Sequence, residues 1–219
     1  MLDWVTVESA RVGNSEFVLG REGDDWVVRV DQRILMSNRM HDSEISLAEL
    51  GVERFDDPKT VLVGGLGLGY TLRAVLDEVA PDAVVTVAEF VPQLVDWNRR
   101  LLGHLNDHPL DDPRCRVVVG DVFDVIRQSP RTFDVILLDV DNGPRALAQA
   151  KNQRIYGDGG VRACYDALTP GGVLGVWSSE PNAKYAQRLG RFPFDVEVLR
   201  VDARTGSWAK HVLFFAKRA

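Results

Sequence analysis

A glycine-rich turn between an apolar run and an amphipathic segment constrains this fold more than any other feature. The run Thr60–Val63 is apolar and β-branched, and it leads into Gly64-Gly65-Leu66-Gly67-Leu68-Gly69, with the amphipathic segment 71–79 close behind. This pattern is typical of a buried parallel strand, a tight turn and a helix start. Glycines let the backbone turn sharply and admit a ligand, and the first helical turn carries free N–H groups. We therefore expect a nucleotide-type ligand at this turn.

Strands and helices alternate after this turn. Apolar runs predict strands at 84–88, 116–119, 133–138 and 173–177, and amphipathic segments predict helices at 91–102, 122–128 and 161–168. The last two apolar runs, 194–201 and 211–216, are joined by a polar loop without a helix, which predicts a hairpin. Near-continuous apolar strands between helices indicate a parallel sheet covered on both faces. We expect an α/β fold with a mostly parallel seven-stranded sheet and an antiparallel last strand.

The N-terminal part follows a different pattern. Residues 1–37 alternate as short antiparallel strands do, with runs at 17–19, 26–30 and 34–36 that predict a small β-meander. Asp42 or Ser43 is placed to cap a helix that stops at Gly51, and a polar loop covers 52–59. The expected organisation is a short N-terminal β-region with a linking helix (1–51) and an α/β domain (52–219).

Composition excludes several classes of function. The chain has 219 residues, a net charge of −6 and a pI near 5.3, so bulk attraction to nucleic acid or to an anionic membrane is not expected. Its two cysteines fit a reducing compartment and show no metal-ligand spacing. Neither a secretory signal nor an apolar run of membrane-spanning length is visible. We expect a soluble, cytoplasmic protein without a metal.

Acidic residues follow three successive predicted strands. Glu89, Asp121 and Asp139 stand where the carboxyl ends of parallel strands gather, and ligands of open α/β sheets bind there. Glu89 lies twenty residues beyond Gly69, the distance at which an acid accepts ribose hydroxyls in dinucleotide folds. Each acid also has a plainer explanation: Asp121 is placed to cap its helix, for example. Three acids after a glycine turn make a nucleotide site the better interpretation.

The turn itself selects among nucleotide folds. It reads G-x-G-x-G, with Tyr70 where a dinucleotide fingerprint has its last glycine, which disfavours an NAD-dependent enzyme. No G-K-[ST] is present, so a P-loop is excluded. Together with the acid after the second strand and the terminal hairpin, this turn resembles the Rossmann-like class I S-adenosylmethionine-dependent methyltransferase fold.

Within that superfamily, the sequence is similar to the spermidine synthase-like proteins, the aminopropyltransferases. Residues 61–69 resemble the family's "VLVIGGGDG" turn, residues 88–92 its "VEIDP", and Gly120-Asp121 its "GD". Residues 133–144 are similar to "YDVIIVDSSDP", residues 168–172 to "LxPGG", and residues 40–44 to the "YHE" element. The resemblance covers about residues 30–180.

The resemblance implies a site in which an adenosyl-sulfonium donor meets a small-molecule acceptor such as an amine. It implies that Asp139, with Asp141, is the catalytic acid pair. The implied donor contacts are Gly64, Gly65, Gly67, Gly69, Glu89, Phe90, Asp121, Val122 and Asp139. The implied acceptor contacts are His41, Glu44 and Asn142, and the position of Trp177 at the end of the fifth predicted strand places it to line the acceptor pocket as well. The donor is S-adenosylmethionine or its decarboxylated form, and the family analogy implies a homodimer.

The sequence departs from the family pattern at informative positions. The aspartate of "GGGDG", which the resemblance implies contacts the aminopropyl ammonium, is Leu68; the tyrosine of "YHE" is Met40; and the second aspartate of "DSSDP" falls at Asn142. Because Leu68 removes a carboxylate, the sequence favours methyl transfer to an amine or hydroxyl. Two alternatives stay open: a polyamine aminopropyltransferase acting on putrescine or a related amine, and a non-catalytic nucleotide-binding homologue.

Overall fold

The chain begins with a small antiparallel sheet, as the alternating pattern predicts. The computed structural model describes residues 3–140 and 153–219. The first strands, taken from the described residues, form a sheet in the order β1(Trp4–Val12), β2(Ser15–Glu22), β3(Asp25–Val30) and β4(Arg33–Ser37). Each is antiparallel to the next, and Gly13 and Gly23 adopt positive φ in the hairpin turns.

The second sheet confirms the predicted α/β architecture. Within the described residues it has seven strands in the order β10-β11-β9-β8-β5-β6-β7. Their bounds are β5(Thr60–Gly64), β6(Val84–Glu89), β7(Cys115–Val119), β8(Phe133–Leu138), β9(Leu168–Ser178), β10(Phe194–Asp202) and β11(Lys210–Arg218). β5 to β9 are mutually parallel, whereas β11 is antiparallel to both β9 and β10. The predicted terminal hairpin is therefore present.

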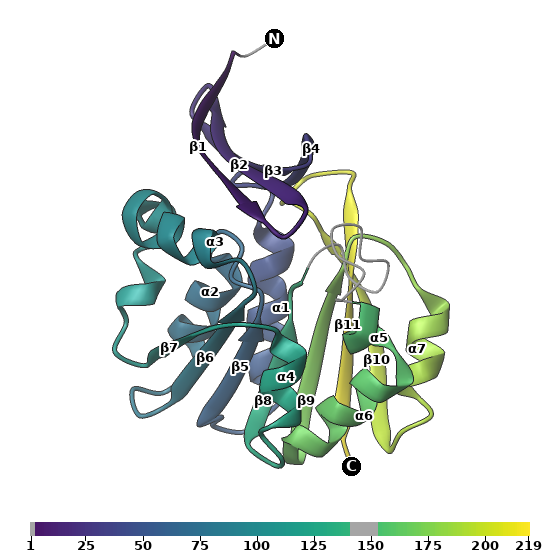
Figure 1. Cartoon of the computed structure of the whole chain (residues 1–219). Helices are drawn as coiled ribbons and strands as arrows, with labels where there is room; N and C mark the ends of the chain where they lie inside the picture. Colours follow the sequence, from purple (N-terminus) through teal and green to yellow (C-terminus); the bar gives the residue numbers. More distant parts are fainter. Residues whose placement is uncertain (1–2, 141–152) are drawn as a thin grey trace.

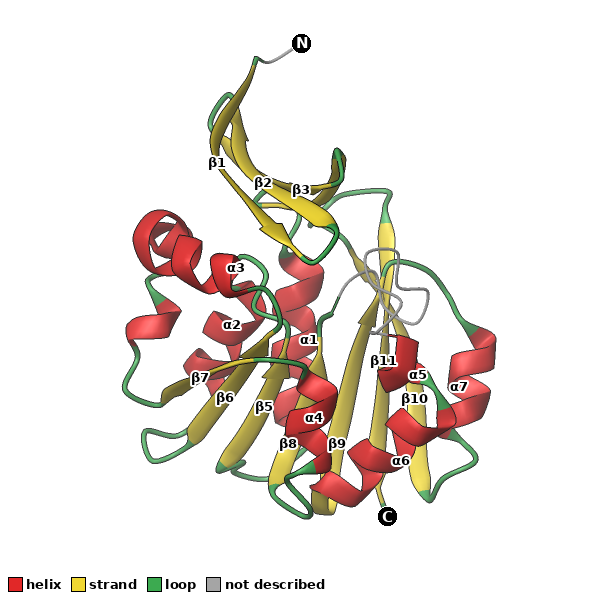
Figure 2. Ribbon diagram, viewed as in Figure 1, coloured by secondary structure: helices red, strands yellow, loops and turns green. Residues whose placement is uncertain are grey.

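Helices cover both faces of this sheet (Figures 1 and 2). α1(Asp42–Glu53) and α2(Tyr70–Glu78) pack on one face; α4(Val122–Arg127), α6(Asp158–Ala167) and α7(Ala183–Leu189) pack on the other. α3(Pro92–Trp97) continues into a π-helical turn, η1(Asn98–Leu102), and the short turns η2(Gly103–Leu105) and η3(Pro109–Asp111). α5(Gln153–Tyr156) precedes α6. Apolar strands buried on both faces thus form two cores.

The N-terminal sheet lies over the carboxyl ends of the parallel strands (Figure 1). A third hydrophobic cluster holds it there by joining Phe17 and Val28 of this sheet to Leu68, Leu94 and other residues of the turn and α3–η1. Polar contacts add to the attachment. Arg100 binds both Glu8 and Asp96, and Trp97 Nε1 donates to Glu8 at 2.8 Å. The small sheet therefore covers the edge of the large sheet at which ligands bind in such folds.

The linking helix differs from its prediction at both ends. α1 begins after His41, without a side-chain cap from Asp42 or Ser43, and it continues through Gly51 to Glu53. Gly51 faces the large sheet, where an added Cβ would lie 2.6 Å from Leu137. Gly51 therefore permits close helix–sheet packing instead of ending the helix. The division at 51/52 stays a prediction, and α1 spans that boundary.

Three further segments depart from the sequence prediction. The strand predicted at 173–177 begins earlier, because residues 169–172 belong to the long strand β9, within which Gly171 has a φ of +75°. Segment 183–189 forms helix α7, which the sequence analysis did not predict, and its start is capped by Asn182 accepting from Tyr185 N–H at 3.0 Å. The predicted helix at 91–102 is α-helical only to Trp97, beyond which it changes to the π form. Such π-turns are often found at functional sites.

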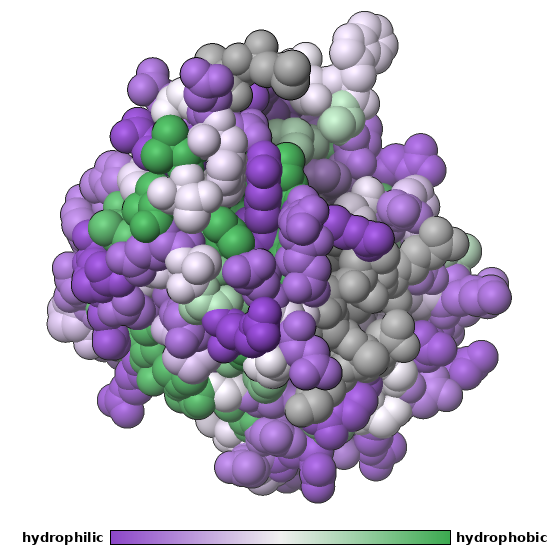
Figure 3. Space-filling view, turned by 45° about the horizontal axis from the view of Figure 1, so that its top comes forward, coloured by the Kyte–Doolittle hydropathy of each residue, from purple (hydrophilic) through white to green (hydrophobic). Residues whose placement is uncertain are grey.

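The surface agrees with the composition. In the space-filling view of Figure 3 most of the visible face is hydrophilic, and hydrophobic residues gather there in small groups. Among the described residues, no helix is both long and apolar enough to cross a membrane.

Candidate functional site

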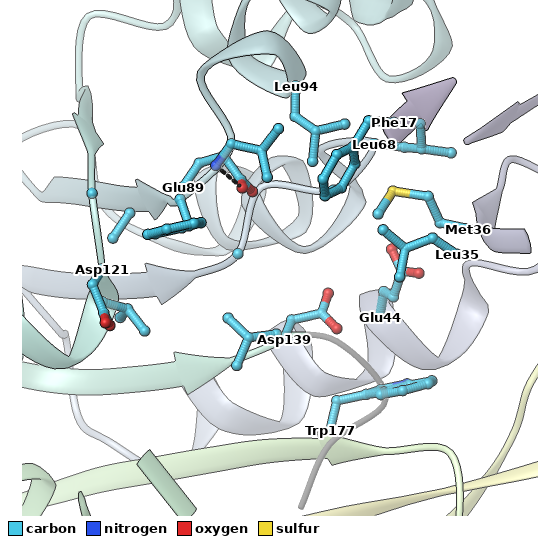
Figure 4. A pocket seen from close by; sticks show the side chains of 18 residues that line it. Phe17, Leu35, Met36, Glu44, Leu68, Glu89, Leu94, Asp121, Asp139 and Trp177 are labelled. Atoms are coloured by element: carbon cyan, nitrogen blue, oxygen red, sulfur yellow. Dashed lines mark hydrogen bonds between the residues drawn. The ribbon is translucent and has the colours of Figure 1, made fainter. Parts of the chain in front are cut away.

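A cavity opens where the glycine turn, the strand ends and the N-terminal sheet meet. The space inside it amounts to about 940 Å³, which includes open solvent at the mouth. Most of the residues predicted to bind ligand line it: Glu44, Gly65, Gly67, Glu89, Phe90, Asp121, Val122, Asp139 and Trp177. Figure 4 shows Asp121 at one end of the cavity and Glu44, Asp139 and Trp177 toward the other.

The glycine turn requires glycine for two physical reasons. Gly65 has a φ of +89°, and a Cβ on it would lie 2.2 Å from the carbonyl oxygen of Asp139. Gly69 has a φ of +90°, and a Cβ there would lie 2.7 Å from Asn106 Nδ2. A side chain at either position would thus be strained and would clash. Gly65 packs the turn against β8, whereas Gly69 packs it against the segment after α3.

Glu89 organises the backbone of the turn. Glu89 is 5% exposed, and its carboxylate accepts hydrogen bonds from Leu66 N at 2.9 Å and from Val91 N at 2.8 Å. The acid that ends β6 therefore joins the glycine turn to the start of α3. A carboxylate offers about four acceptor positions, so this role is compatible with the predicted contact to ribose hydroxyls. That contact stays a prediction.

Asp121 caps α4, as its plainer explanation proposes. One carboxylate oxygen accepts from Phe123 N at 2.9 Å, and the other accepts from the guanidinium of Arg154 at 2.8 Å. The guanidinium also lies over the Phe123 ring, 4.8 Å from its centroid. Asp121 lines the cavity as well, so the predicted adenine contact stays a prediction beside the observed cap.

Two acids meet at the other end of the cavity. Asp139 follows β8 and accepts from the Thr71 hydroxyl at 2.7 Å, while Glu44 projects from the first turn of α1. In Figure 4 both carboxyl groups point into the same part of the cavity, with the Trp177 indole beneath them. The pair stands next to the glycine turn, because Asp139 N donates to Gly64 O at 2.8 Å.

Burial raises the pKa values of both Glu44 and Asp139. Desolvation raises the pKa of Asp139 to about 6, although the hydrogen bond from Thr71 opposes that rise. Desolvation also raises the pKa of Glu44 well above its usual range, and the charge of Asp139 raises it further. Two like charges in a poorly hydrated site disfavour full ionisation. The pair therefore holds a proton at mildly acidic pH and attracts a cation.

We expect Asp139→Asn to be more stable than the unsubstituted chain at pH 8 and to lose this advantage toward pH 4. The folded pKa of Asp139 lies above its unfolded value, so its favourable contribution exists below about pH 4 and is lost as pH rises through about 6. The difference amounts to at most about 3 kcal/mol. Urea unfolding at both pH values measures it. Asp195→Asn, on an exposed strand position, is the control, and a pH-independent effect of Asp139→Asn would contradict the assignment.

The residues predicted to contact the acceptor divide into groups. Glu44 and Trp177 line the cavity. His41 does not appear among the described lining residues; its ring stacks on Tyr70 with centroids 4.1 Å apart, and its Nδ1 lies 3.1 Å from Asn38 O. Asp141 and Asn142 lie outside the described residues. In the described part of the chain, Gly64 and Gly69 shape the turn without lining the cavity.

Sequence reasoning missed an apolar wall of the cavity. Phe17, Leu35 and Met36 reach it from the N-terminal sheet, and Leu68 and Leu94 reach it from the turn and α3. Figure 4 shows these side chains gathered on one side. Their only signal in the sequence is apolar character, which core residues share. Leu68, noted there as a missing carboxylate, is 2% exposed and packs within this wall.

Two buried asparagines that support the turn were also missed. Asn98 Nδ2 donates to Gly67 O at 2.9 Å, and Asn106 Nδ2 donates to Leu68 O. Both asparagines belong to the segment after α3, which sequence reasoning treated as helix end and loop. A polar side chain in an otherwise apolar helical segment is the signal that could have identified Asn98.

A known protein family matches most of this chain. The family described as "Spermine/spermidine synthase domain" matches residues 40–187. Polyamine aminopropyltransferase 2 of Pseudomonas aeruginosa is 33% identical over 145 residues, which are 61% of this chain and 39% of that protein. The polyamine aminopropyltransferase of Aeropyrum pernix is 27% identical over 188 residues, 79% of this chain and 59% of that protein. The chain thus spans less than two thirds of the length of either relative.

Solved structures agree on the fold. A spermidine synthase in complex with the transition state analogue AdoDATO matches with a TM-score of 0.84 and 22% identity, over 98% of this chain and 74% of that chain. The spermidine synthase of Thermotoga maritima matches with a TM-score of 0.80 and 21% identity, over 98% and 72%. The predicted Rossmann-like architecture and the predicted resemblance are both confirmed. With its glycine turn, its strand-end acids and a family match over most of its length, this chain belongs to the spermine/spermidine synthase family.

Proposed function

We propose that this protein is an aminopropyltransferase, which moves an aminopropyl group from decarboxylated S-adenosylmethionine to a small amine. The names of the similar proteins from Pseudomonas aeruginosa and Aeropyrum pernix support this choice. The sequence favours methyl transfer, because Leu68 removes a carboxylate, with aminopropyl transfer as an alternative; the similar proteins favour that alternative. Plain S-adenosylmethionine as donor finds no support in them.

The observation that carries the proposal is the carboxylate pair of Glu44 and Asp139. It lies in the same cavity as the glycine turn and Glu89, so a donor held by the turn would place its reactive carbon near these acids. Ammonium groups are recognised by carboxylates through charge-assisted hydrogen bonds. A paired, poorly hydrated carboxylate site suits a cationic amine better than it suits a neutral or anionic acceptor.

The same pair suits the chemistry. An amine nitrogen attacks only when its lone pair is free, so the ammonium must first lose a proton, and a carboxylate with a raised pKa is the better acceptor of it. The nitrogen lone pair then forms a bond to the carbon attached to the sulfonium. The carbon–sulfur bond breaks, and its electrons leave a neutral thioether. Alignment and exclusion of water supply much of the remaining rate.

Calorimetric titration of the protein with the two donors tests the proposal. We expect decarboxylated S-adenosylmethionine to bind more tightly than S-adenosylmethionine, and putrescine or a related amine to be consumed in the presence of the first. Tighter binding of S-adenosylmethionine, with methylated product, would reinstate methyl transfer. Binding of either donor without turnover of any amine or hydroxyl acceptor would support the non-catalytic homologue.

Leu68→Asp is expected to tighten the binding of decarboxylated S-adenosylmethionine by about tenfold, because it restores a carboxylate that the resemblance implies contacts the donor ammonium. The same change places a charge in the apolar wall, so it should lower the free energy of unfolding by roughly 2–4 kcal/mol. Leu68→Asn is the matched control, since it alters the packing similarly without adding charge. Equal donor affinity in the two variants would show that Leu68 does not face the donor ammonium.

The homodimer and the cytoplasmic location expected from the sequence stay predictions. Light scattering of the purified chain tests the first, and a dimer mass is the expected result.

A further inference from the structure

The indole ring of Trp177 is fixed by two polar residues that the proposed chemistry does not use. Trp177 Nε1 donates to Ser43 Oγ at 3.0 Å, and Ser43 Oγ lies 2.8 Å from His211 Nδ1. The rings of Trp177 and His211 also meet edge to face, with centroids 4.6 Å apart and an interplanar angle of 71°. These residues belong to β9, α1 and β11, so the contact joins three elements that are distant in sequence.

The direction of one of these hydrogen bonds follows from its chemistry. An indole N–H only donates, so Ser43 Oγ is the acceptor from Trp177. Ser43 Oγ keeps one proton and a second lone pair, so the donor of the Ser43–His211 bond is set by which nitrogen of the imidazole carries the proton. Partial burial lowers the pKa of His211, which favours the neutral ring. The serine itself is 1% exposed, so water competes weakly for either bond.

This hydrogen-bond network contacts, from two sides, the end of the cavity where the carboxylates of Glu44 and Asp139 lie. Ser43 directly precedes Glu44 in the first turn of α1, and Trp177 lines the cavity together with Glu44 and Asp139. In Figure 4 the indole lies beneath the two carboxyl groups, with its plane seen nearly edge-on. An ammonium held by the carboxylates in this position would also lie over an aromatic face, which attracts cations.

We propose that Ser43 and His211 are positioning residues for the acceptor: they hold the Trp177 ring as the wall of the amine-binding end. The inference rests on the proposed function, because it assumes that an amine occupies this end. Without the hydrogen bond the indole would keep its packing but gain freedom to tilt. Its face would then no longer be held in one orientation toward the bound amine.

Spectroscopy of the indole N–H tests the positioning itself. In ¹⁵N-labelled protein the Trp177 signal is identified by its loss in Trp177→Phe, and the fully exposed Trp208 serves as an internal reference. Ser43→Ala and His211→Phe are expected to shift the Trp177 signal. His211→Gln is expected to keep the Trp177 signal at its original position, because the glutamine amide carries both a donor and an acceptor for the Ser43 hydroxyl. An unchanged Trp177 signal in Ser43→Ala would overturn the inference.

Steady-state kinetics test the consequence for the acceptor. Ser43→Ala and His211→Phe are expected to raise the KM for putrescine roughly five- to tenfold, the effect of losing one hydrogen bond, with the donor KM within twofold of the original. His211→Gln should restore the amine KM, and Ser46→Ala, in the same helix, should leave it unchanged. An equal rise in both KM values, or failure of the glutamine variant to rescue, would contradict a positioning role.

The two proposals fail in different ways. If no amine is turned over, the proposed function is wrong, and the Trp177 signal still decides the inference through its response to added putrescine. A shift of the Trp177 signal on addition of putrescine that is absent in Ser43→Ala supports the inference. A Trp177 signal that does not shift at millimolar putrescine overturns it.

Discussion

Asp139→Asn is expected to lower kcat for amine transfer by about 10²- to 10⁴-fold, the usual contribution of a positioned general base. The amide is nearly isosteric and still accepts from the Thr71 hydroxyl, so the end of β8 and the turn beside it should keep their geometry. What is lost is a proton acceptor beside Glu44. The amide oxygen keeps a hydrogen-bond acceptor for the donor contact implied for Asp139, and the acceptors at the turn are unchanged, so the donor should bind within about threefold of its original affinity.

Single-turnover measurements with saturating donor separate this loss from slow product release. Asp195→Asn, the same chemical change at an exposed position of β10, is the control for the substitution itself. Glu44→Gln should weaken amine binding more than it slows the chemical step, since Glu44 is placed to hold the ammonium. Retention of more than a tenth of kcat in Asp139→Asn would assign the proton acceptor to another group.

Gly65→Ala should lower the free energy of unfolding by about 3–5 kcal/mol. Two costs add at this position. An alanine at a φ of +89° is strained, and its Cβ would lie 2.2 Å from the carbonyl oxygen of Asp139, a backbone atom that moves only if the end of β8 moves. Donor affinity should fall as well, because the turn and Asp139 would be displaced from each other.

A matched variant isolates the clash from the backbone strain. Gly171 has a φ of +75° with open space where a Cβ would be, so Gly171→Ala should cost only about 1–2 kcal/mol. Urea unfolding of both variants measures the difference. If Gly65→Ala proves too unstable to study, Gly67 has a φ of +53° and an added Cβ there meets only Met36, so Gly67→Ala should fold, at a cost of about 1–2 kcal/mol from backbone strain, and reduce donor affinity. Equal costs for Gly65→Ala and Gly171→Ala would contradict the close approach of the turn to β8.

The limits of sequence reasoning are clearest in α1. Gly51 looked like a helix stop, since glycine commonly ends helices. In the folded chain it lies against Leu137 of the sheet, and the tight packing there offsets its low helix propensity. Helix α7 was missed for a related reason. Its seven residues are too few to show a clear helical period in the sequence. The helix is stabilised by Tyr185 and Leu189, which are buried against the sheet.

In the site, too, some features are predicted by the local sequence and others depend on the packing of residues that are distant in the chain. The glycine turn and the acids after β6, β7 and β8 were found from the sequence because parallel strands bring their carboxyl ends to one edge. The partner of Asp139 is different. The resemblance proposed Glu44 as an acceptor contact, but only packing of α1 on the sheet brings its carboxylate into the same pocket and raises the pKa of both acids.

Local chain chemistry by itself determined the alternation of strands and helices, the terminal hairpin, the glycine turn and the family resemblance. These follow from side-chain period and backbone freedom, which act over a few residues. Tertiary structure alone decided which residues surround the turn and the cavity. Phe17 and Met36 line the cavity from the N-terminal sheet, Ser43 contacts His211, and the Glu89 carboxylate accepts a hydrogen bond from the turn backbone. Such contacts join residues that are far apart in the chain, and their geometry arises only when sheet and helices pack together.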